Sequence, residues 1–308
     1  MRITAFSEKG DGKLVERASW SRKSFLAFNY IVLSVMALAC LFPIVQMVAV
    51  SFSSGAAASS GRVTIFPIEF TLDAYRYVMR NDAFMRAVWV SVERIMLGCT
   101  LQMLMMVLIA YPLSKDVSKF RYRTVYVWFF MITILFSGGL IPTYLTIKAT
   151  GLLNTVWALI IPSAVPVFSV VLLLNFFRNL PKELSEAAFI DGAGHWKTLW
   201  KVYIPLSTPG LATLLLFSLV GHWNSWFDGI IYMNSPERYP LQSYLQTIIL
   251  MKQDSSALSV MDANILANLS DRTLKSAQIG LGALPILLVY PFLQRFFMKG
   301  IVLGSVKE

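Results

Sequence analysis

The chain has 308 residues, of which 56% are hydrophobic and only 14% are charged, and its formal net charge is +10. Soluble domains carry roughly 25% charged residues, so this composition excludes an ordinary water-soluble globule. The two cysteines, Cys40 and Cys99, both lie in apolar runs and indicate neither a disulfide framework nor a metal site. The composition therefore predicts a membrane protein.

Six apolar runs are long enough to cross a bilayer, for which about 18 or more nearly uncharged residues are needed. Glu93 and Arg94 lie near the start of the second run. The apolar core of the first run is longer than that of a cleaved signal peptide, which predicts a retained span, although the small-residue tract SSGAAASSG after it resembles a cleavage site. The sequence predicts an all-α polytopic membrane protein with six transmembrane helices, at about residues 25–52, 87–113, 124–147, 156–177, 209–233 and 279–298.

Basic residues indicate how these spans are oriented. Lys and Arg gather in the amino-terminal tail, in the loop between the second and third runs, and in the loop between the fourth and fifth runs. Short loops rich in Lys and Arg stay in the cytoplasm, so we expect both termini on that side. The same asymmetry accounts for most of the positive charge, and no nucleic-acid partner is needed to explain it.

The chain is expected to divide into a cytoplasmic amino-terminal tail (1–24), one six-span domain (25–300) and a cytoplasmic carboxy-terminal tail (301–308). Two outer segments, about 53–86 and 234–275, are long enough to have structure of their own. The spacing of apolar residues in SPERYPLQSYLQTIILMKQ predicts a short helix in the second of them. The alternative for that segment is a solvated connector.

Two spans are predicted to bend. SGGLIP (137–142) places paired glycines and a proline in the third run, and Pro162 and Pro166 lie one turn apart in the fourth. Irregular backbone at membrane depth is tolerated where protein or a water-filled cavity covers it, so we expect these breaks along a translocation path, with kinked packing helices as the alternative. Tyr144 and Ser163, on these two spans, are candidate pathway residues.

An amphipathic stretch, EAAFIDGAGHWKTLWKVYIP (186–205), separates the fourth run from the fifth. Pro181 suits a first helical turn and acidic residues follow it, as helix amino ends favour. Asp191 and Gly192 form a helix stop signal, because Gly192 can take the left-handed conformation. The pattern predicts a short cytoplasmic helix that ends near residue 191.

A second short helix is expected after this turn. Trp196, Trp200 and Tyr203 would fall on one stripe at i, i+4, i+7 spacing, and Pro205 would end the helix before the next span. Residues 179–205 are therefore predicted to form a helix, a turn and another helix held between two spans, which is the anatomy of a docking element. The alternative is an interfacial helix whose tryptophans anchor it among lipid headgroups.

The pattern E-A-A, three residues, G, nine residues, I-x-L-P resembles the signature loop of permease subunits of ATP-binding-cassette (ABC) importers. It is present here with Val202 in place of the usual Ile and Ile204 in place of the usual Leu, which keeps both side chains apolar. In that family the loop is a coupling helix that fits a groove on the cytoplasmic ATPase. The resemblance implies that the coupling residues here are Glu186, Ala187, Ala188, Asp191 and Gly192, with Trp196 beside them.

The resemblance extends over nearly the whole chain from residue 25 onward and is to the carbohydrate-importing branch, in particular to the second permease of maltose-type systems. It implies a type I ABC importer permease (MetI-like) fold in a bacterial plasma membrane, with both termini cytoplasmic. The SGGLIP variant resembles permeases that handle uronate-rich fragments such as alginate or pectin oligosaccharides. The segments that carry the resemblance are FSGGLIPTYLTIKATGLLNT (136–155), NFFRNLPKELSEAAFIDGA (175–193), IPLSTPG (204–210), HWNSWFD (222–228) and the ending KGIVLGSVKE.

The family also implies the partners: a homologous second permease in a heterodimer, two cytoplasmic ABC ATPase subunits, an extracytoplasmic solute-binding protein and an oligosaccharide substrate. The chain has no G-x-x-x-x-G-K-[ST] loop, so we expect it to bind no cofactor and to be no enzyme by itself. ATP and magnesium would bind to the partner ATPases.

HWNSWFD is the best candidate for substrate contact. Counting about 1.5 Å per residue from Pro209 places His222 roughly 20 Å into the span. Polar groups at that depth face a cavity or a partner helix, and tryptophan faces beside amide and carboxylate groups suit a sugar. Asn224 and Asp228 are four residues apart, hence on one helix face. The alternative is that the tryptophans pack near the outer interface while Asn224 and Asp228 cap a break in the span. The predicted contacts are Trp223, Asn224, Trp226 and Asp228, and an unpaired Asp228 would argue against an anionic sugar.

Three other functions compete with this interpretation. A secondary transporter or channel without an ATPase would need buried charged relays in several spans, but Glu93 and Asp228 are the acidic residues well inside the predicted spans. An intramembrane enzyme would need a catalytic constellation, and His195 and His222 are expected on opposite sides of the membrane. A membrane scaffold would dock a partner other than an ATPase.

Overall fold

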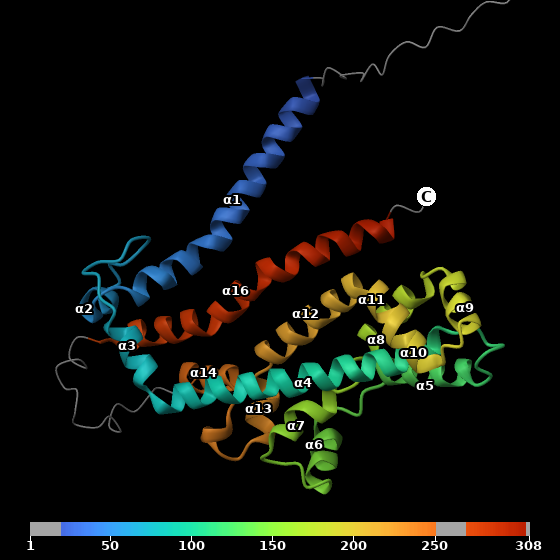
Figure 1. The fold of residues 1–308 in the computed structure, drawn as a ribbon. Helices are drawn as coiled ribbons and strands as arrows, with labels where there is room; N and C mark the ends of the chain where they lie inside the picture. Colours follow the sequence, from blue (N-terminus) through green and yellow to red (C-terminus); the bar gives the residue numbers. More distant parts are fainter. Residues whose placement is uncertain (1–19, 251–268, 306–308) are drawn as a thin grey trace, which may run out of the picture.

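The computed structural model describes residues 20–250 and 269–305, and within these ranges the chain forms helices and loops without any β-strand. Figure 1 shows α4 running the length of the folded body, with α12 and α16 along one side and α6 and α7 on the other. The long helices are α1 (Trp20–Ser51), α4 (Asp82–Ser114) and α16 (Asp271–Ser305). All three are long and apolar enough to cross a membrane.

Three bent pairs of shorter helices supply the remaining candidate spans, so the described residues contain up to six, as the sequence predicts. The first pair is α5 (Arg123–Leu135) with α6 (Leu140–Ala149). The second joins α7 (Val156–Ile160) and the 3-10 turn η1 (Ile161–Ser163) to α8 (Val167–Arg178). The third joins a continuous helical path, formed by α10 (His195–Thr198), η2 (Leu199–Tyr203) and α11 (Ile204–Leu206), to α12 (Thr208–Asn224).

Helix α4 is the axis of the fold. Its 33 residues give a rod about 50 Å long, and it packs against α8, α12, α7 and α14. Met106, Ala110 and Tyr111 belong to a buried apolar cluster that also includes Leu173 of α8 and Leu214 of α12. Helices α7, α8, α12 and α14, which contribute to the sites described below, therefore all pack against this one helix.

At the predicted bend in the third apolar run, the chain turns through more than a right angle. Helix α5 ends at Leu135, Gly139 takes a φ of +82°, and α6 starts at an angle of 116° to α5. The left-handed conformation is accessible to glycine without strain, which explains why the chain turns there. The predicted bend within residues 124–147 is therefore confirmed, and it is so sharp that α6 does not continue the direction of α5. The fourth run bends by 49° between η1 and α8, beside Pro166.

The fifth apolar run is also broken. Helix α12 ends at Asn224, and α13 (Phe227–Tyr232) starts after an extended Ser225. The prediction that Asn224 and Asp228 share the face of one helix was wrong, because they lie on different helices. The break is stabilised by the Asp228 carboxylate, which accepts hydrogen bonds from the Ser225 hydroxyl at 2.8 Å and from the Gly229 amide at 2.9 Å.

The predicted outer segments contain short helices that gather at one end of the body (Figure 1). They are α2 (Gly55–Ser59), α3 (Asp73–Arg80), the 3-10 turn η3 (Pro236–Arg238) and α14 (Leu241–Leu250), and the last of these confirms the predicted helix. Residues 251–268 of the second outer segment and residues 1–19 of the amino-terminal tail lie outside the described residues. Helix α16 continues to Ser305, so it includes most of the segment predicted as a carboxy-terminal tail.

Helix α1 differs from the others in its surroundings. In Figure 1 it packs near its carboxyl end and then extends away from the body, while its contacts are mainly with α16. Almost all of its apolar side chains before Ala49 are exposed, with none of its most apolar stretch buried. The helix is therefore stabilised within this chain by its last turns only.

The packing of α4 on α12 predicts a difference between two glycine substitutions. A Cβ at Gly98 of α4 would lie 2.6 Å from Nε2 of His222, whereas a Cβ at Gly221 of α12 would meet nothing within 4 Å. Both changes to Ala gain helix propensity, but Gly98→Ala also overpacks a buried site, which costs about 1–3 kcal/mol. Purified Gly98→Ala protein should therefore melt at a lower temperature than Gly221→Ala protein, and equal melting temperatures would contradict this packing.

Candidate functional site

The predicted coupling element begins with α9 (Lys182–Ile190). Pro181 precedes it, Asp191 closes it, and Gly192 has a φ of +75°, which confirms the predicted stop signal. The amides of Asp191, Gly192 and Ala193 donate to the last carbonyls of α9, so the turn is closed by its own backbone. The helix and turn form a compact projection at the end of the body opposite α2 and α3 (Figure 1).

The second half of the element differs from the expected amphipathic α-helix. Residues Leu199–Tyr203 form a π-helical turn, and the helical path ends at Leu206, one residue after Pro205. Trp196 and Trp200 are exposed whereas Tyr203 is buried. The three aromatic side chains of the predicted stripe therefore do not lie on one face, because the π-helical turn is wider than an α-helical turn. The expectation of one aromatic face was therefore wrong. Spacing rules for an α-helix do not apply where the helix has an inserted residue.

Partly buried contacts fasten this second half to the end of α4. The Tyr111 hydroxyl lies 3.2 Å from Nδ1 of His195, and the Lys115 ammonium donates to the Tyr203 hydroxyl at 2.8 Å. Tyr203 also packs edge-on against Tyr111 and Phe177. A displacement of the element would therefore be transmitted to α4 and α8 without a flexible joint between them.

The six predicted coupling residues occupy the outer surface of this element. Ala188 is half-buried, and the other five are exposed, namely Glu186, Ala187, Asp191, Gly192 and Trp196. Two large apolar side chains, Ile190 at 86% and Trp200 at 54% exposure, lie on the same element. Small residues and exposed apolar side chains on a rigid projection suit a protein partner.

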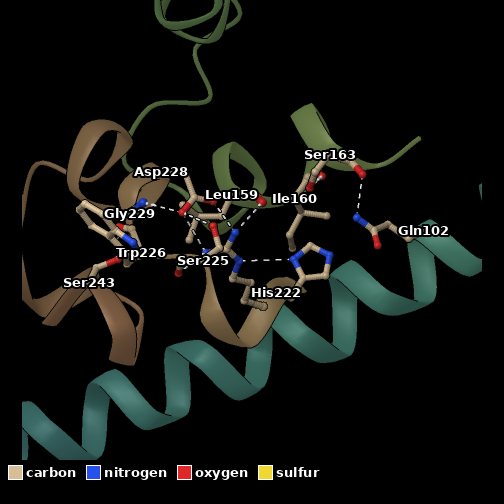
Figure 2. A network of polar contacts seen from close by, with 11 residues as sticks. Gln102, Leu159, Ile160, Ser163, His222, Ser225, Trp226, Asp228, Gly229 and Ser243 are labelled. Carbon is tan, nitrogen blue, oxygen red and sulfur yellow. Dashed lines mark hydrogen bonds and ion pairs between the residues drawn. The ribbon is translucent and has the colours of Figure 1, made fainter. Parts of the chain in front are cut away.

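A network of polar contacts lies inside the body around the break in the fifth run (Figure 2). Its centre is Arg94 of α4, which is 2% exposed and forms an ion pair with both oxygens of Asp228. The guanidinium also donates to the carbonyl oxygens of Ser225 and Leu159 and, at 3.4 Å, to Nδ1 of His222. One side chain thus joins α4, α7 and both sides of the break between α12 and α13.

A second polar group continues along α4. The Gln102 amide donates to the carbonyl of Ser163 at 2.7 Å, and its oxygen accepts from the Ser218 hydroxyl at 2.6 Å. Both groups line a cavity of about 310 Å³ together with Arg94 and Asp228. Ser163 therefore lies beside this cavity, and its role as a pathway residue stays a prediction. Within the described residues, Nε2 of His222 is a buried atom without a hydrogen-bond partner.

A different cavity, of about 420 Å³, lies on the other side of the break. Trp223, Asn224 and Trp226 line it, and Gln242 and Gln246 of α14 supply two more amide groups. Trp223 is buried and donates from Nε1 to the carbonyl of Gly282 at 3.0 Å, whereas Trp226 is 40% exposed. Aromatic faces next to amides match the apolar C–H faces and the hydroxyls of a sugar.

The predicted pathway residues are thus divided between separate places. Asp228 pairs with Arg94 and lines the first cavity, not the one that the tryptophans line. Tyr144 of α6 packs in an apolar cluster with Ile147 and Leu159 and lines neither cavity. The structure therefore brings Trp223, Asn224 and Trp226 together.

Sequence reasoning missed the partner of Asp228. The sequence shows that Glu93 and Arg94 both lie near the start of the second run. It does not show that Arg94 is buried while Glu93 is exposed. Two opposite charges in different spans are a signal for pairing, because an unpaired charge at membrane depth is costly. Gln102 and Ser218 carried no comparable signal.

The two histidines are well separated. His195 contacts Tyr111 and His222 contacts Arg94, and these partners are 17 positions apart on α4, which is about 25 Å along the helix. They cannot form one catalytic site. Within the described residues, no group of three His, Cys, Asp or Glu side chains could hold a metal ion.

A set of candidate spans with cavities between them and a projection at one end is the arrangement expected of a membrane transport permease. The family described as "Binding-protein-dependent transport system inner membrane component" matches residues 100–302, and the chain belongs to this family. It is therefore the permease component of an ABC transport system.

Relatives support the same assignment. The chain is 40% identical over 269 residues to Protein LplC of Bacillus subtilis, covering 87% of this chain and 89% of that protein. It is 38% identical over 276 residues to the polygalacturonan/rhamnogalacturonan transport system permease protein YtcP of the same organism, covering 89% and 95%. Its fold matches a chain of a bacterial ABC transporter involved in the import of the acidic polysaccharide alginate, with a TM-score of 0.84, 32% identity and coverage of 91% and 99%.

The Arg94–Asp228 pair generates a stability prediction. Arg94→Met leaves the Asp228 carboxylate without its buried partner, and breaking such a pair costs about 3–5 kcal/mol. The matched control is Arg86→Met, because Arg86 and Glu237 form a 3.5 Å ion pair whose side chains are 50% and 75% exposed, and such pairs contribute at most about 1 kcal/mol. Arg94→Met should lower the melting temperature of the purified protein far more than Arg86→Met. Similar decreases in melting temperature for the two variants would contradict the burial of Arg94.

Proposed function

We propose that this chain is the transmembrane permease subunit of an ATP-driven importer that moves acidic, uronate-containing oligosaccharides across the bacterial plasma membrane. The observation that carries the substrate class is the pairing of Asp228 with Arg94. An unpaired carboxylate would repel a uronate, but this one is neutralised by a guanidinium. The aromatic and amide cavity next to it then offers sugar contacts without a net negative charge.

The relatives support this substrate class. Two of them are described as transporters of acidic sugar polymers, polygalacturonan or rhamnogalacturonan in one case and alginate in the other. A structure of an alginate transporter, to which this chain is 18% identical with a TM-score of 0.54, contains a periplasmic protein bound to an alginate pentasaccharide. A solute-binding protein is accordingly our proposed donor of substrate, and α2, α3 and α14 at the outer end are its proposed contact surface.

The energy would come from ATP bound with magnesium in two partner ATPases, which dock on α9 and the turn after it. A homologous second permease would complete the membrane domain as a heterodimer. Closure of the ATPases would push on the exposed residues of α9, and the contacts of Tyr203 and His195 with the end of α4 would carry this movement into the membrane. Each ligand shifts the balance of transporter states only by its differential affinity for them.

The coupling role predicts the effect of a bulky side chain in the turn. Gly192 has a φ of +75°, is exposed and has open space around it, so Gly192→Trp should block a docking partner as well as strain the turn. We expect at least about a tenfold loss of substrate-stimulated ATP hydrolysis, which corresponds to about 1.4 kcal/mol, together with weaker retention of the ATPases during purification.

The matched control is Gly151→Trp. Gly151 also has a positive φ, of +72°, and open space, but it lies in the turn between α6 and α7. The same strain there should leave ATPase retention unchanged. Intact assembly and ATP hydrolysis in Gly192→Trp would contradict the coupling role.

The sugar role predicts a loss of uptake from Trp226→Ala. Stacking on an aromatic face contributes roughly 1–3 kcal/mol for planar ligands, so uptake of a trigalacturonate or alginate trisaccharide by vesicles with the complete transporter should fall about tenfold. Trp226→Phe should keep most of the uptake, because it keeps the face. Trp89→Ala is the control, since Trp89 is 68% exposed and lines neither cavity. Unchanged uptake in Trp226→Ala would remove this residue from the pathway.

A further inference from the structure

A cationic cavity of about 380 Å³ lies where four helix ends meet, beside the coupling element. Helices α4 and α8 end here, at Ser114 and Arg178, and α5 and α9 begin here, at Arg123 and Lys182. Because α4 and α8 belong to candidate membrane spans, their ends lie at a membrane surface. The cavity therefore opens where lipid headgroups are found. Lys115 and Tyr203, which hold the coupling element on α4, form part of its wall, and no residue of the proposed sugar pathway lines it.

The charge of this cavity is strongly unbalanced. One carboxylate, that of Asp116, faces five cationic side chains, which leaves an excess of four positive charges; the cations are those of Lys115, Lys119, Arg123, Arg178 and Lys182. Lys182 donates to Asp116 at 3.0 Å, and this hydrogen bond is the main reason why the pKa of Asp116 is lowered. The carboxylate is thus charged at neutral pH and still balances only one cation.

Several of these cations are held in place and keep donors to spare. Arg123 donates from Nε to the carbonyl of Leu113 at 2.8 Å, and Arg178 donates to the same oxygen at 3.4 Å. The Lys115 ammonium is 4.2 Å and 4.0 Å from the ring centres of Tyr111 and Tyr203. A guanidinium has five N–H donors and an ammonium three, so an anion can be bound without breaking these contacts. Fixed donors around a cavity suit the several oxygens of a phosphate.

The start of α9 adds to the positive potential. Lys182 and Ser185 of its first turn line the cavity, and no side chain caps the helix start at Pro181. The amide groups of a helix amino end carry a partial positive charge and favour phosphate. This contribution supplements the five side chains and would not define a site without them.

An apolar cavity of about 600 Å³ adjoins the cationic one. Lys115 and Lys119 line both, and the second is otherwise formed mainly by apolar and aromatic groups. Leu108, Pro112 and Phe120 are among them. Two connected cavities, one cationic and one apolar, at the surface of a membrane fit a molecule with an anionic head and a hydrocarbon tail.

We propose that this pair of cavities binds an anionic phospholipid, with the phosphate among Lys119, Arg123, Arg178 and Lys182 and the beginning of an acyl chain against Leu108 and Phe120. A free phosphate would leave the apolar cavity unfilled. An acidic segment of a protein docked on α9 would meet the cations but would leave the apolar cavity unfilled. The proposal rests on the position of these helix ends and not on the identity of the transported sugar.

The site predicts a selective effect of lipid headgroup and tail on stability. The complete transporter, purified in a neutral detergent, should be titrated with dioctanoyl phosphatidylglycerol, dioctanoyl phosphatidylcholine or inorganic phosphate while its melting temperature is measured. Only the phosphatidylglycerol should raise it at low concentration, and added salt should weaken the effect.

Substitutions that change the charge in opposite directions distinguish binding from misfolding. One cation near a membrane surface contributes a factor of about five to lipid affinity, so Lys119→Gln should raise the half-maximal phosphatidylglycerol concentration about fivefold. Asp116→Asn removes the single carboxylate of the cavity and releases Lys182, so it should lower that concentration by a similar factor. Arg121→Gln is the matched control, because Arg121 is exposed on the same loop and lines neither cavity.

Each other outcome would overturn the proposal. Equal stabilisation by phosphatidylcholine would show that the charge is irrelevant. Equal stabilisation by inorganic phosphate would show that the apolar cavity is irrelevant. A weaker effect in Asp116→Asn, or the same effect in Lys119→Gln and Arg121→Gln, would place the lipid elsewhere. Loss of ATPase subunits from Lys119→Gln without any change in lipid response would assign the cavity to a protein contact.

Discussion

The buried guanidinium of Arg94 is the constraint on which the membrane half of this fold depends. An ion removed from water costs several kcal/mol unless its partners replace the lost hydration, and this requirement fixes the positions of several elements at once. The Asp228 carboxylate must lie at the start of α13, and the carbonyls of Ser225 and Leu159 must point inward. The break in the fifth apolar run therefore has an energetic reason, since an unbroken helix would keep the Ser225 carbonyl in its own hydrogen-bond ladder.

The same helix connects this network to the other end of the molecule. Arg94 lies in the first half of α4, whereas Tyr111 and Lys115 at the other end hold the second half of the predicted coupling element. A movement applied to α9 would thus reach the break between α12 and α13 through one rod and the apolar cluster around it. The cavity that we propose for the sugar is formed at that break, which places the proposed coupling surface and the proposed substrate contacts on a single mechanical path.

Much of this arrangement could be predicted from the sequence, because apolar run length, basic loops and a turn at Gly192 are local signals. Helix α9, helix α14 and the bends of the third and fourth runs all come from such signals. What could not be predicted depends on contacts between distant segments. The pairing of Asp228 with Arg94, the π-helical turn that buries Tyr203 and exposes Trp200, and the location of Tyr144 in an apolar cluster are set by packing rather than by spacing.

The central claim is that Arg94 and Asp228 stabilise each other inside the membrane domain. A double-mutant cycle measures this most directly, with unfolding of the purified protein compared among wild type, Arg94→Met, Asp228→Asn and the double variant. Contacting residues show coupling energies of about 0.5–3 kcal/mol. We expect a value toward the upper end of that range, with the double variant more stable than the sum of the single losses predicts. Losses that add to within about 0.5 kcal/mol would show that the two groups do not interact.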